Sequence, residues 1–383
     1  MIKTMLTHEI GSLAKPEWRV KSARGLPITQ QNIDEAVSWG KRLGIDTDNL
    51  VSLLKKSKRT AEENKEIHRL SSFFGLRLME HAGIDIVYDG EQQRTEMYHQ
   101  AVSQTGGFEF YGHVRSFDNK YYRKGACVDK PKFTKAYHLE EFKQISKMTR
   151  RPLKVPITGA YTIGDWSYDE YYSQRTFDIG TSAGRSARKA ARRKFVLDVA
   201  RYVIKPNIQA LVKAGAAWIQ IDEPAVTSHP DEVPIFVESF NASTEGLRGT
   251  FSVHICFSDY ANLFPHITKL KNCSQYALEF ANRDSRNLGT RDSDRPGYQV
   301  LKLFKKYKIP GAIGLGVTDI HTDFLEPVEL VRDRILYAVK VMGDHRLIFP
   351  TPDCGLRTRS LDIAYEKLKR TVIGTRLAEA KLV

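Results

Sequence analysis

The segment Phe251-Ser-Val-His-Ile-Cys-Phe-Ser-Asp-Tyr260 has the β-branched and aromatic composition of a short strand. It is one of eight such runs, which alternate with longer helical patterns along the whole chain. This alternation is typical of a parallel sheet covered by helices, and eight repeats predict an α/β fold of the (β/α)8 TIM-barrel class. The predicted strands span Thr7–Ser12, Ile84–Glu91, Lys154–Ala160, Trp218–Pro224, Thr250–Phe257, Gln275–Ala281, Ala312–Asp319 and Arg346–Asp353.

Two insertions interrupt the repeat. Residues 30–82 carry two helical patterns after the first predicted strand, the second ending at His81-Ala-Gly83. Residues 105–137 alternate aromatic, polar and glycine residues, which predicts a β-hairpin excursion after the second strand. No repeat, low-complexity segment or linker divides the chain, so we expect residues 1–383 to form a single catalytic barrel.

Composition narrows the class of protein. The apolar fraction of 41% can build a sizeable core, and no run approaches the ~20 apolar residues of a membrane span. The N-terminal segment lacks the apolar core of a signal peptide. Four cysteines are too few for a disulfide framework in 383 residues. We therefore expect a cytoplasmic protein with reduced thiols and no membrane partner; the roles of Cys127 and Cys273 stay open.

The net charge of +14 is concentrated in the segment 185–194, where Arg185, Arg188, Lys189 and Arg192 share one helical face. An anion-binding or nucleic-acid-binding surface is one interpretation of this face. Neither interleaved aromatic residues nor a nucleic-acid-binding motif accompanies the charge. We therefore favour a solvated outer helix face and consider a nucleic-acid partner unlikely.

Polar residues stand near the ends of the predicted strands, where a barrel of this class builds its active site. We therefore predict one site formed from Ser12, Glu91, Thr158-Gly159, Asp222-Glu223, His254, Cys256, Glu279, Asp319, His321 and Cys354.

Four of these residues suggest a metal. His254 and Cys256 are two apart on a strand and so point to the same face. Together with Glu279 and Cys354 they offer one nitrogen, two sulfurs and one oxygen, a set that suits zinc rather than magnesium, calcium or an iron–sulfur cluster. Zinc with two thiolates and a carboxylate is electron-rich. It is therefore better suited to holding a substrate thiolate for alkylation than to activating water.

At this point the sequence resembles a known family. A series of segments, in order along nearly the whole chain, is similar to successive motifs in the C-terminal catalytic barrel of cobalamin-independent methionine synthase. The chain looks like a short, core-type member without the N-terminal barrel of the long form. The motifs are Ile10-Gly-Ser12, Asp89-Gly-Glu-Gln-Gln-Arg-Thr-Glu-Met97, Thr158-Gly-Ala-Tyr-Thr-Ile-Gly-Asp-Trp-Ser167, Gln220-Ile-Asp-Glu-Pro-Ala225, His254-Ile-Cys256, Asp319-Ile-His321 and Pro352-Asp-Cys-Gly-Leu356.

The resemblance implies roles for these residues. It implies a methyltransferase of methionine biosynthesis, with zinc at His254, Cys256, Glu279 and Cys354 and with homocysteine as the methyl acceptor. It implies that Ser12, Glu91 and Asp222 bind the amino-acid end of homocysteine. His321, with Asp319 nearby, would serve proton transfer, and Trp166 and Arg94 would contact the methyl donor.

Two departures from the long form affect the donor. The chain has Glu91-Gln-Gln-Arg94 in place of Glu-Pro-Glu-Arg, and Ile163-Gly-Asp-Trp166 in place of Ile-Leu-Asn-Trp. The donor therefore stays open between a methylfolate or methylpterin and a methylated corrinoid protein. One alternative function is alkylation of another thiol, such as coenzyme M. A second alternative is a non-catalytic basic zinc protein that binds nucleic acid.

Overall fold

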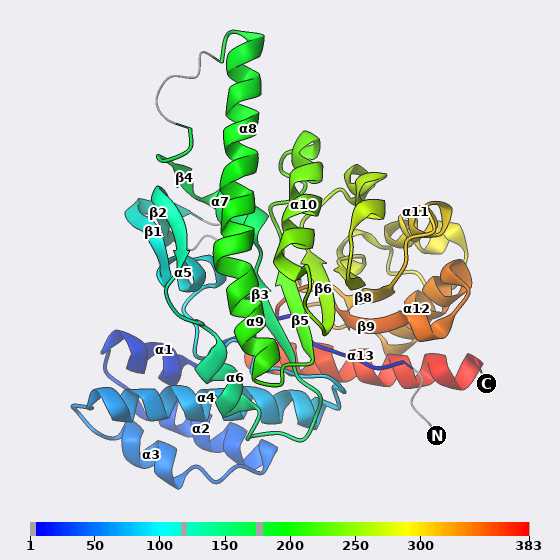
Figure 1. The fold of residues 1–383 in the computed structure, drawn as a ribbon. Helices are drawn as coiled ribbons and strands as arrows, with labels where there is room; N and C mark the ends of the chain where they lie inside the picture. Colours follow the sequence, from blue (N-terminus) through cyan, green and yellow to red (C-terminus); the bar gives the residue numbers. More distant parts are fainter. Residues whose placement is uncertain (1–4, 116–120, 174–178, 383) are drawn as a thin grey trace.

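The computed structural model describes residues 5–115, 121–173 and 179–382, and it has an α/β fold built on a parallel sheet (Figure 1). Six parallel strands lie in the order β3-β5-β6-β7-β8-β9. Nearly all their residues are buried, as expected where helices cover a parallel sheet. The strands are β3 Lys154–Thr158, β5 Trp218–Asp222, β6 Thr250–Ile255, β7 Cys273–Leu278, β8 Ala312–Thr318 and β9 Ile348–Pro352.

These six strands confirm six of the eight predicted runs, whereas the first two runs differ from the prediction. Residues 7–12 and 84–91 form only isolated parallel bridges, between His8 and Ile86 and between Val87 and Leu153. Two prolines on the neighbouring strand segments explain the interruption. The carbonyls of Pro350 and Pro152 accept hydrogen bonds from the backbone of His8 and Val87, but proline has no N–H to continue a regular ladder.

The backbone of residues 7–8 and 86–87 nevertheless connects the two edges of the sheet. The His8 N–H donates to Pro350 in β9 at 3.3 Å, and the Ile86 N–H donates to the Thr7 carbonyl at 3.0 Å. The Lys154 N–H at the start of β3 donates to the Val87 carbonyl at 3.1 Å. A continuous series of backbone hydrogen bonds therefore runs from β9 back to β3.

The predicted helical insertion contains three helices rather than two: α2 Gln30–Leu43, α3 Asp48–Leu54 and α4 Ala61–Ala82. The α3 helix is only seven residues long, too short for a clear periodic pattern. The α4 helix begins at a Thr60–Glu63 capping box and ends at Gly83, whose φ of 95° is left-handed, as the sequence predicted. Together with α1 Glu17–Arg24, these helices gather beside the C-terminal helix α13 Leu361–Leu382 (Figure 1).

The predicted hairpin is confirmed. Strand β1 Thr105–Arg115 pairs antiparallel with β2 Tyr121–Phe133, and the short strand β4 Tyr168–Asp169 adds to β2 in parallel. This small sheet lies beside helix α5 Met97–Val102 (Figure 1). The small sheet thereby places residues of the hairpin near the carboxyl ends of the strands in the main sheet.

The basic segment lies on α8 Ser182–Val199, which extends beyond the rest of the fold (Figure 1). Acidic neighbours pair with several of its cations: Lys189 with Asp231 at 3.5 Å, Arg192 with Asp165 at 2.5 Å and Glu232 at 3.0 Å, and Arg193 with Glu238. These pairs fit the interpretation of an outer helix face.

The remaining helices cover the sheet and its connections: α6 Leu139–Ile145, α7 Ala160–Trp166, α9 Lys205–Lys213, α10 Val233–Thr244, α11 Leu301–Lys306 and α12 Val328–Met342, with a π-helical turn at Ala200–Ile204 between α8 and α9. Within the described residues, no helix combines the length and apolar character needed to cross a bilayer.

Candidate metal centre and substrate cavity

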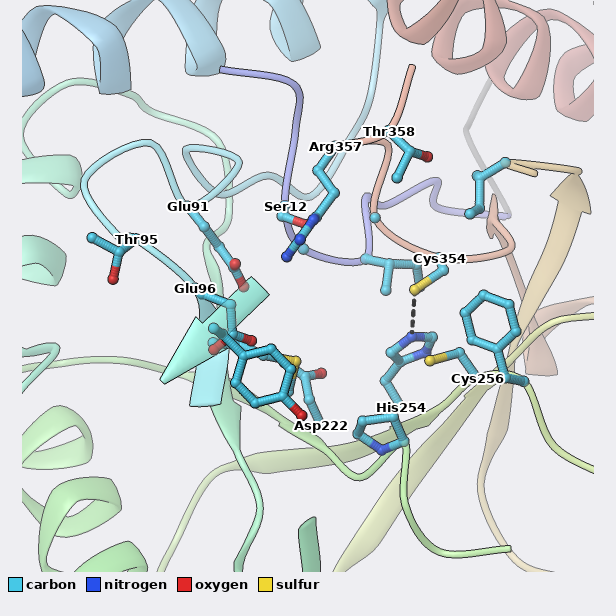
Figure 2. A pocket seen from close by; sticks show the side chains of 18 of the residues that line it. Ser12, Glu91, Thr95, Glu96, Asp222, His254, Cys256, Cys354, Arg357 and Thr358 are labelled. Atoms are coloured by element: carbon cyan, nitrogen blue, oxygen red, sulfur yellow. Dashed lines mark hydrogen bonds between the residues drawn. The ribbon is translucent and has the colours of Figure 1, made fainter. Parts of the chain in front are cut away.

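His254 and Cys256 come together at the carboxyl end of β6, as the alternation along the strand predicted. The His254 Nδ1 lies 3.0 Å from the Ala277 carbonyl oxygen on β7. Because a carbonyl only accepts, Nδ1 carries the proton, which leaves Nε2 facing the Cys354 Sγ at 3.2 Å (Figure 2). The neighbouring strand therefore fixes the tautomer that presents Nε2 as a ligand.

Cys354 follows β9, 100 residues further along the chain, and completes a group of three. The donor atoms of His254, Cys256 and Cys354 all lie within 4.8 Å of one another. Throughout the part of the chain that the structure describes, this is the only group of three or more histidine, cysteine or acidic residues close enough to hold a metal ion. One imidazole nitrogen and two sulfurs are ligands that zinc prefers.

The three side chains perturb one another strongly. Hydrogen bonds from the Cys256 thiol and the His254 imidazole, together with the charge of His254, lower the pKa of Cys354 despite its burial. Burial lowers the pKa of His254, but the Cys354 thiolate outweighs that effect and raises it to about 9. The hydrogen bond to Cys354 and burial raise the pKa of Cys256 well above its usual value. The buried group thus holds exchangeable protons that a cation can replace.

Glu279, the fourth predicted ligand, lies outside this group of three. Its carboxylate Oε2 accepts hydrogen bonds from the Phe257 N–H at 2.8 Å and from the Asn282 side chain at 3.0 Å. Its Oε1 lies 3.4 Å from the His321 Nε2. Glu279 is buried directly after β7, close enough for its charge to act on all three donors, but it does not join their group.

A cavity of about 680 Å³ opens beside the three donors and is lined by Ser12, Glu91 and Asp222 (Figure 2). The residues predicted to bind the amino-acid end of homocysteine therefore share one cavity with the two cysteine sulfurs. Burial is the largest cause that raises the pKa of Asp222, and the charge of Glu91 adds to it. A cation in this cavity would relieve that electrostatic stress.

Backbone strain marks the same cavity. Among the described residues, four non-glycine residues have a positive φ, and two of these, Glu91 at 57° and Phe257 at 53°, line the cavity. Residues in this region are uncommon outside glycine and cluster at functional sites.

His321 lies beside Glu279 but is not among the residues that line the cavity. The Asp319 carboxylate accepts a hydrogen bond from the His321 backbone N–H at 2.8 Å, not from its imidazole. The imidazole instead faces Glu279 and packs edge-on against Phe257, with ring centroids 4.5 Å apart. Burial lowers the pKa of His321, but the hydrogen bond and charge of Glu279 leave it above the usual value.

The two residues predicted to contact the donor lie in different surroundings. Trp166 lines the cavity and packs against Tyr98 and Tyr122, with centroids 6.0 and 6.1 Å apart. Arg94 is buried and is not among the residues that line the cavity. Its guanidinium donates to Glu141 at 2.6–3.1 Å and to the Pro156 carbonyl at 2.9 Å. Arg94 therefore braces the segment that carries Glu91, which it approaches at 3.4 Å.

Several cavity residues were missed from the sequence. Glu96 lines the cavity and caps α5, its carboxylate accepting from the His99 N–H at 2.8 Å. Its place in the Asp89–Met97 motif could have indicated a role in the site, but a carboxylate that precedes a helix is more simply interpreted as its N-cap. Further missed residues line the cavity from α1, the hairpin and the segment after Cys354, and no local sequence pattern brings these three segments together. They are Arg24, Arg115, Tyr121, Tyr122, Arg357 and Thr358.

Comparisons with known proteins identify the family of this chain. Residues 45–376 match the family model described as cobalamin-independent synthase, catalytic domain. A methionine synthase of Thermoplasma acidophilum is 38% identical over 376 residues, 96% of each chain. One of Thermoplasma volcanium is 41% identical over 318 residues, 82% of this chain and 89% of that protein. The solved structure of a B12-independent methionine synthase from Shewanella sp. W3-18-1, in complex with selenomethionine, has a TM-score of 0.74 at 24% identity. The two structures align over 99% of this chain and 98% of the Shewanella chain.

Proposed function

The chain belongs to the cobalamin-independent methionine synthase family, and we propose that it methylates the thiolate of homocysteine at a zinc centre to give methionine. The observation that carries this proposal is the group of His254, Cys256 and Cys354 beside a cavity that Glu91 and Asp222 also line. Thiolate ligands next to buried carboxylates suit a substrate that has both a thiol and an ammonium group.

The residues present fit zinc. His254, Cys256 and Cys354 would supply three ligands, and Glu279, which borders them, would supply the fourth. Zinc bound there would keep a thiol substrate deprotonated at neutral pH. The hydrogen bond from His254 to the Ala277 carbonyl would hold the imidazole in the orientation that a metal requires. Two free thiols at the centre also suit a reducing compartment such as the cytoplasm.

We also infer that the eight parallel segments close into a (β/α)8 barrel that forms one domain. The backbone hydrogen bonds from β9 through residues 7–8 and 86–87 to β3 support closure. The site supports it too, because its residues lie at or just after the carboxyl ends of β5, β6, β7, β8 and β9, where barrels of this class hold their active sites.

The amino-acid end of homocysteine would lie against Ser12, Glu91 and Asp222. An ammonium group near Glu91 and Asp222 would neutralise two carboxylates that burial leaves poorly solvated. A sulfonate, as in coenzyme M, would be repelled by the same two carboxylates. This pocket therefore favours homocysteine over the alternative thiol.

Replacing Asp222 with asparagine tests the pocket. Removing one partner of a charge-assisted hydrogen bond should weaken homocysteine binding by about 1.5–3 kcal/mol, roughly ten- to a hundredfold. Calorimetry on zinc-loaded Asp222→Asn protein measures this loss. A small alkyl thiol without an amino group is the matched control and should bind wild type and variant alike. Equal homocysteine affinity in both proteins would refute the pocket and leave the metal centre standing.

The methyl donor would approach along the wall formed by Trp166 and Tyr122. An aromatic wall suits a flat pterin ring, and Arg24, Arg115 and Arg357 around the same cavity suit a donor that carries anionic groups. These features favour a methylfolate or methylpterin over a methylated corrinoid protein. Incubating the zinc-loaded protein with homocysteine and each donor in turn, and measuring methionine, tests both the activity and the donor. Failure to form methionine with every donor would refute the proposed function.

A further inference from the structure

Asp353 stands directly before Cys354 and is fully buried. Its carboxylate is not directed at the cavity but accepts three backbone hydrogen bonds from the turn that follows β7. The N–H groups of Phe280 and Ala281 donate to Oδ1, each at 2.9 Å, and that of Asn282 donates to Oδ2 at 2.7 Å. Asp353 thus ties the end of β9 to the turn that begins immediately after Glu279.

This side chain has to cross an intervening strand, because β8 lies between β7 and β9. The crossing occurs at Gly316. A Cβ atom at this position would lie 2.1 Å from the Asp353 Oδ1 and 2.8 Å from the Leu278 carbonyl oxygen. Any larger residue would displace the carboxylate, so Gly316 leaves the space through which Asp353 reaches the turn.

This turn, once fixed by Asp353, also holds the carboxylate of Glu279. The Asn282 side chain, whose backbone N–H is bound by Asp353, donates to the Glu279 Oε2 at 3.0 Å. On the other side, the Glu279 N–H donates to the Tyr260 hydroxyl at 2.9 Å, and this hydroxyl donates to the Ile255 carbonyl at 2.8 Å. The position of Glu279 therefore depends on the turn that Asp353 fixes.

We infer that Asp353 is a positioning residue that sets Glu279 relative to Cys354, and so assembles ligands from two non-adjacent strands into one zinc site. This inference rests on the proposed function, because it takes both residues as ligands. The positioning is geometric. Asp353 acts on Cys354 because the two are adjacent in the chain, and on Glu279 through its three hydrogen bonds with the turn that follows Glu279.

The chain offers a matched control in Glu223, which directly follows β5 and does not line the cavity, although the sequence pattern had placed it in the site. Its buried carboxylate also accepts backbone hydrogen bonds, here from the first turn of helix α7: from Tyr161 at 3.1 Å and Thr162 at 2.7 Å. It too occupies the space of a glycine, since a Cβ on Gly159 would lie 2.2 Å from its carboxyl carbon. Glu223 performs the same structural task without touching the turn after Glu279.

The test compares Asp353→Asn with Glu223→Gln. In Asp353→Asn, an amide NH2 replaces one acceptor and opposes an N–H of the turn, so the zinc affinity should fall about 10- to 100-fold in a chelator competition. The visible spectrum of the Co²⁺-substituted protein should change towards that of Glu279→Gln. Glu223→Gln should lower the melting temperature but leave zinc affinity and the Co²⁺ spectrum as in wild type.

A double-mutant cycle separates positioning from general destabilisation. If Asp353 acts through Glu279, Asp353→Asn should change zinc affinity far less in a Glu279→Gln background than in wild type. Gly316→Ala, which displaces the same carboxylate from another strand, provides the test if Asp353→Asn does not fold. Full additivity, or unchanged zinc affinity in a folded variant, would overturn this inference alone. A wild-type protein that binds no zinc would overturn the proposed function as well.

Discussion

Cys354→Ser and Cys256→Ser proteins should fold but lose tightly bound zinc. Four-ligand zinc sites are worth about 10–16 kcal/mol, so one thiolate contributes about 2.5–4 kcal/mol, roughly 10²–10³-fold in affinity. A serine hydroxyl at neutral pH replaces a soft thiolate poorly. Metal analysis after dialysis against a chelator should find about one zinc per wild-type chain and little in either variant.

Cys273→Ser is the matched control for this experiment. Cys273 is also a buried free cysteine, but it lies at the start of β7, where its Sγ contacts the Gln275 carbonyl at 3.4 Å. The zinc content of the Cys273→Ser protein should therefore equal that of wild type. Full zinc occupancy in both Cys256→Ser and Cys354→Ser would refute the assigned site, whereas zinc loss in Cys273→Ser as well would point to unfolding.

The strands that carry His254, Cys256 and Cys354 were predictable from the sequence because each has its own local signal. His254 and Cys256 are two residues apart on a β-branched run, and this spacing fixes their common face whatever surrounds them. Cys354 could be added because parallel strands bring their carboxyl ends to one edge. The three donors within 4.8 Å of one another are the outcome of these two rules.

Features that depend on contacts across the fold were not predictable. The interruption of the first two strands depends on which neighbours present Pro350 and Pro152, and strand composition does not contain that information. Arg94 was assigned to the donor by its motif, yet its guanidinium is engaged by Glu141, which lies 47 residues away in the chain. Local patterns name candidate side chains, but burial and pairing decide which of them reach the cavity.

The orientation of His321 shows the same limit at the level of one hydrogen bond. The sequence placed Asp319 near His321 without fixing how the two interact, and in this turn the Asp319 carboxylate accepts a hydrogen bond from the His321 backbone N–H. The partner of the imidazole, Glu279, comes from a different strand. The Nε2 atom of His321 is thus held by a residue that sequence spacing did not indicate.

Replacing His321 with asparagine should slow methyl transfer from a methylfolate by about 10²–10⁴-fold, the usual contribution of general acid catalysis. The nitrogen of such a donor leaves poorly unless it is protonated, and the His321 Nε2 can hold that proton 3.4 Å from Glu279, the proposed fourth zinc ligand. Zinc content and homocysteine affinity should stay near wild-type values. Single-turnover measurement of methionine formation, with zinc and homocysteine saturating, isolates the effect on the transfer step.

His345→Asn is the matched control, because His345 lies in the short 3₁₀ turn that precedes β9 and thus at the opposite end of the sheet from Cys354. This variant should transfer methyl groups at the wild-type rate. With a methylcorrinoid donor, the departing cobalt needs no proton, so His321→Asn should then react nearly as fast as wild type. A His321→Asn protein that is fully active with methylfolate would remove the histidine from the mechanism. A large loss with both donors would instead assign it to holding Glu279 in place.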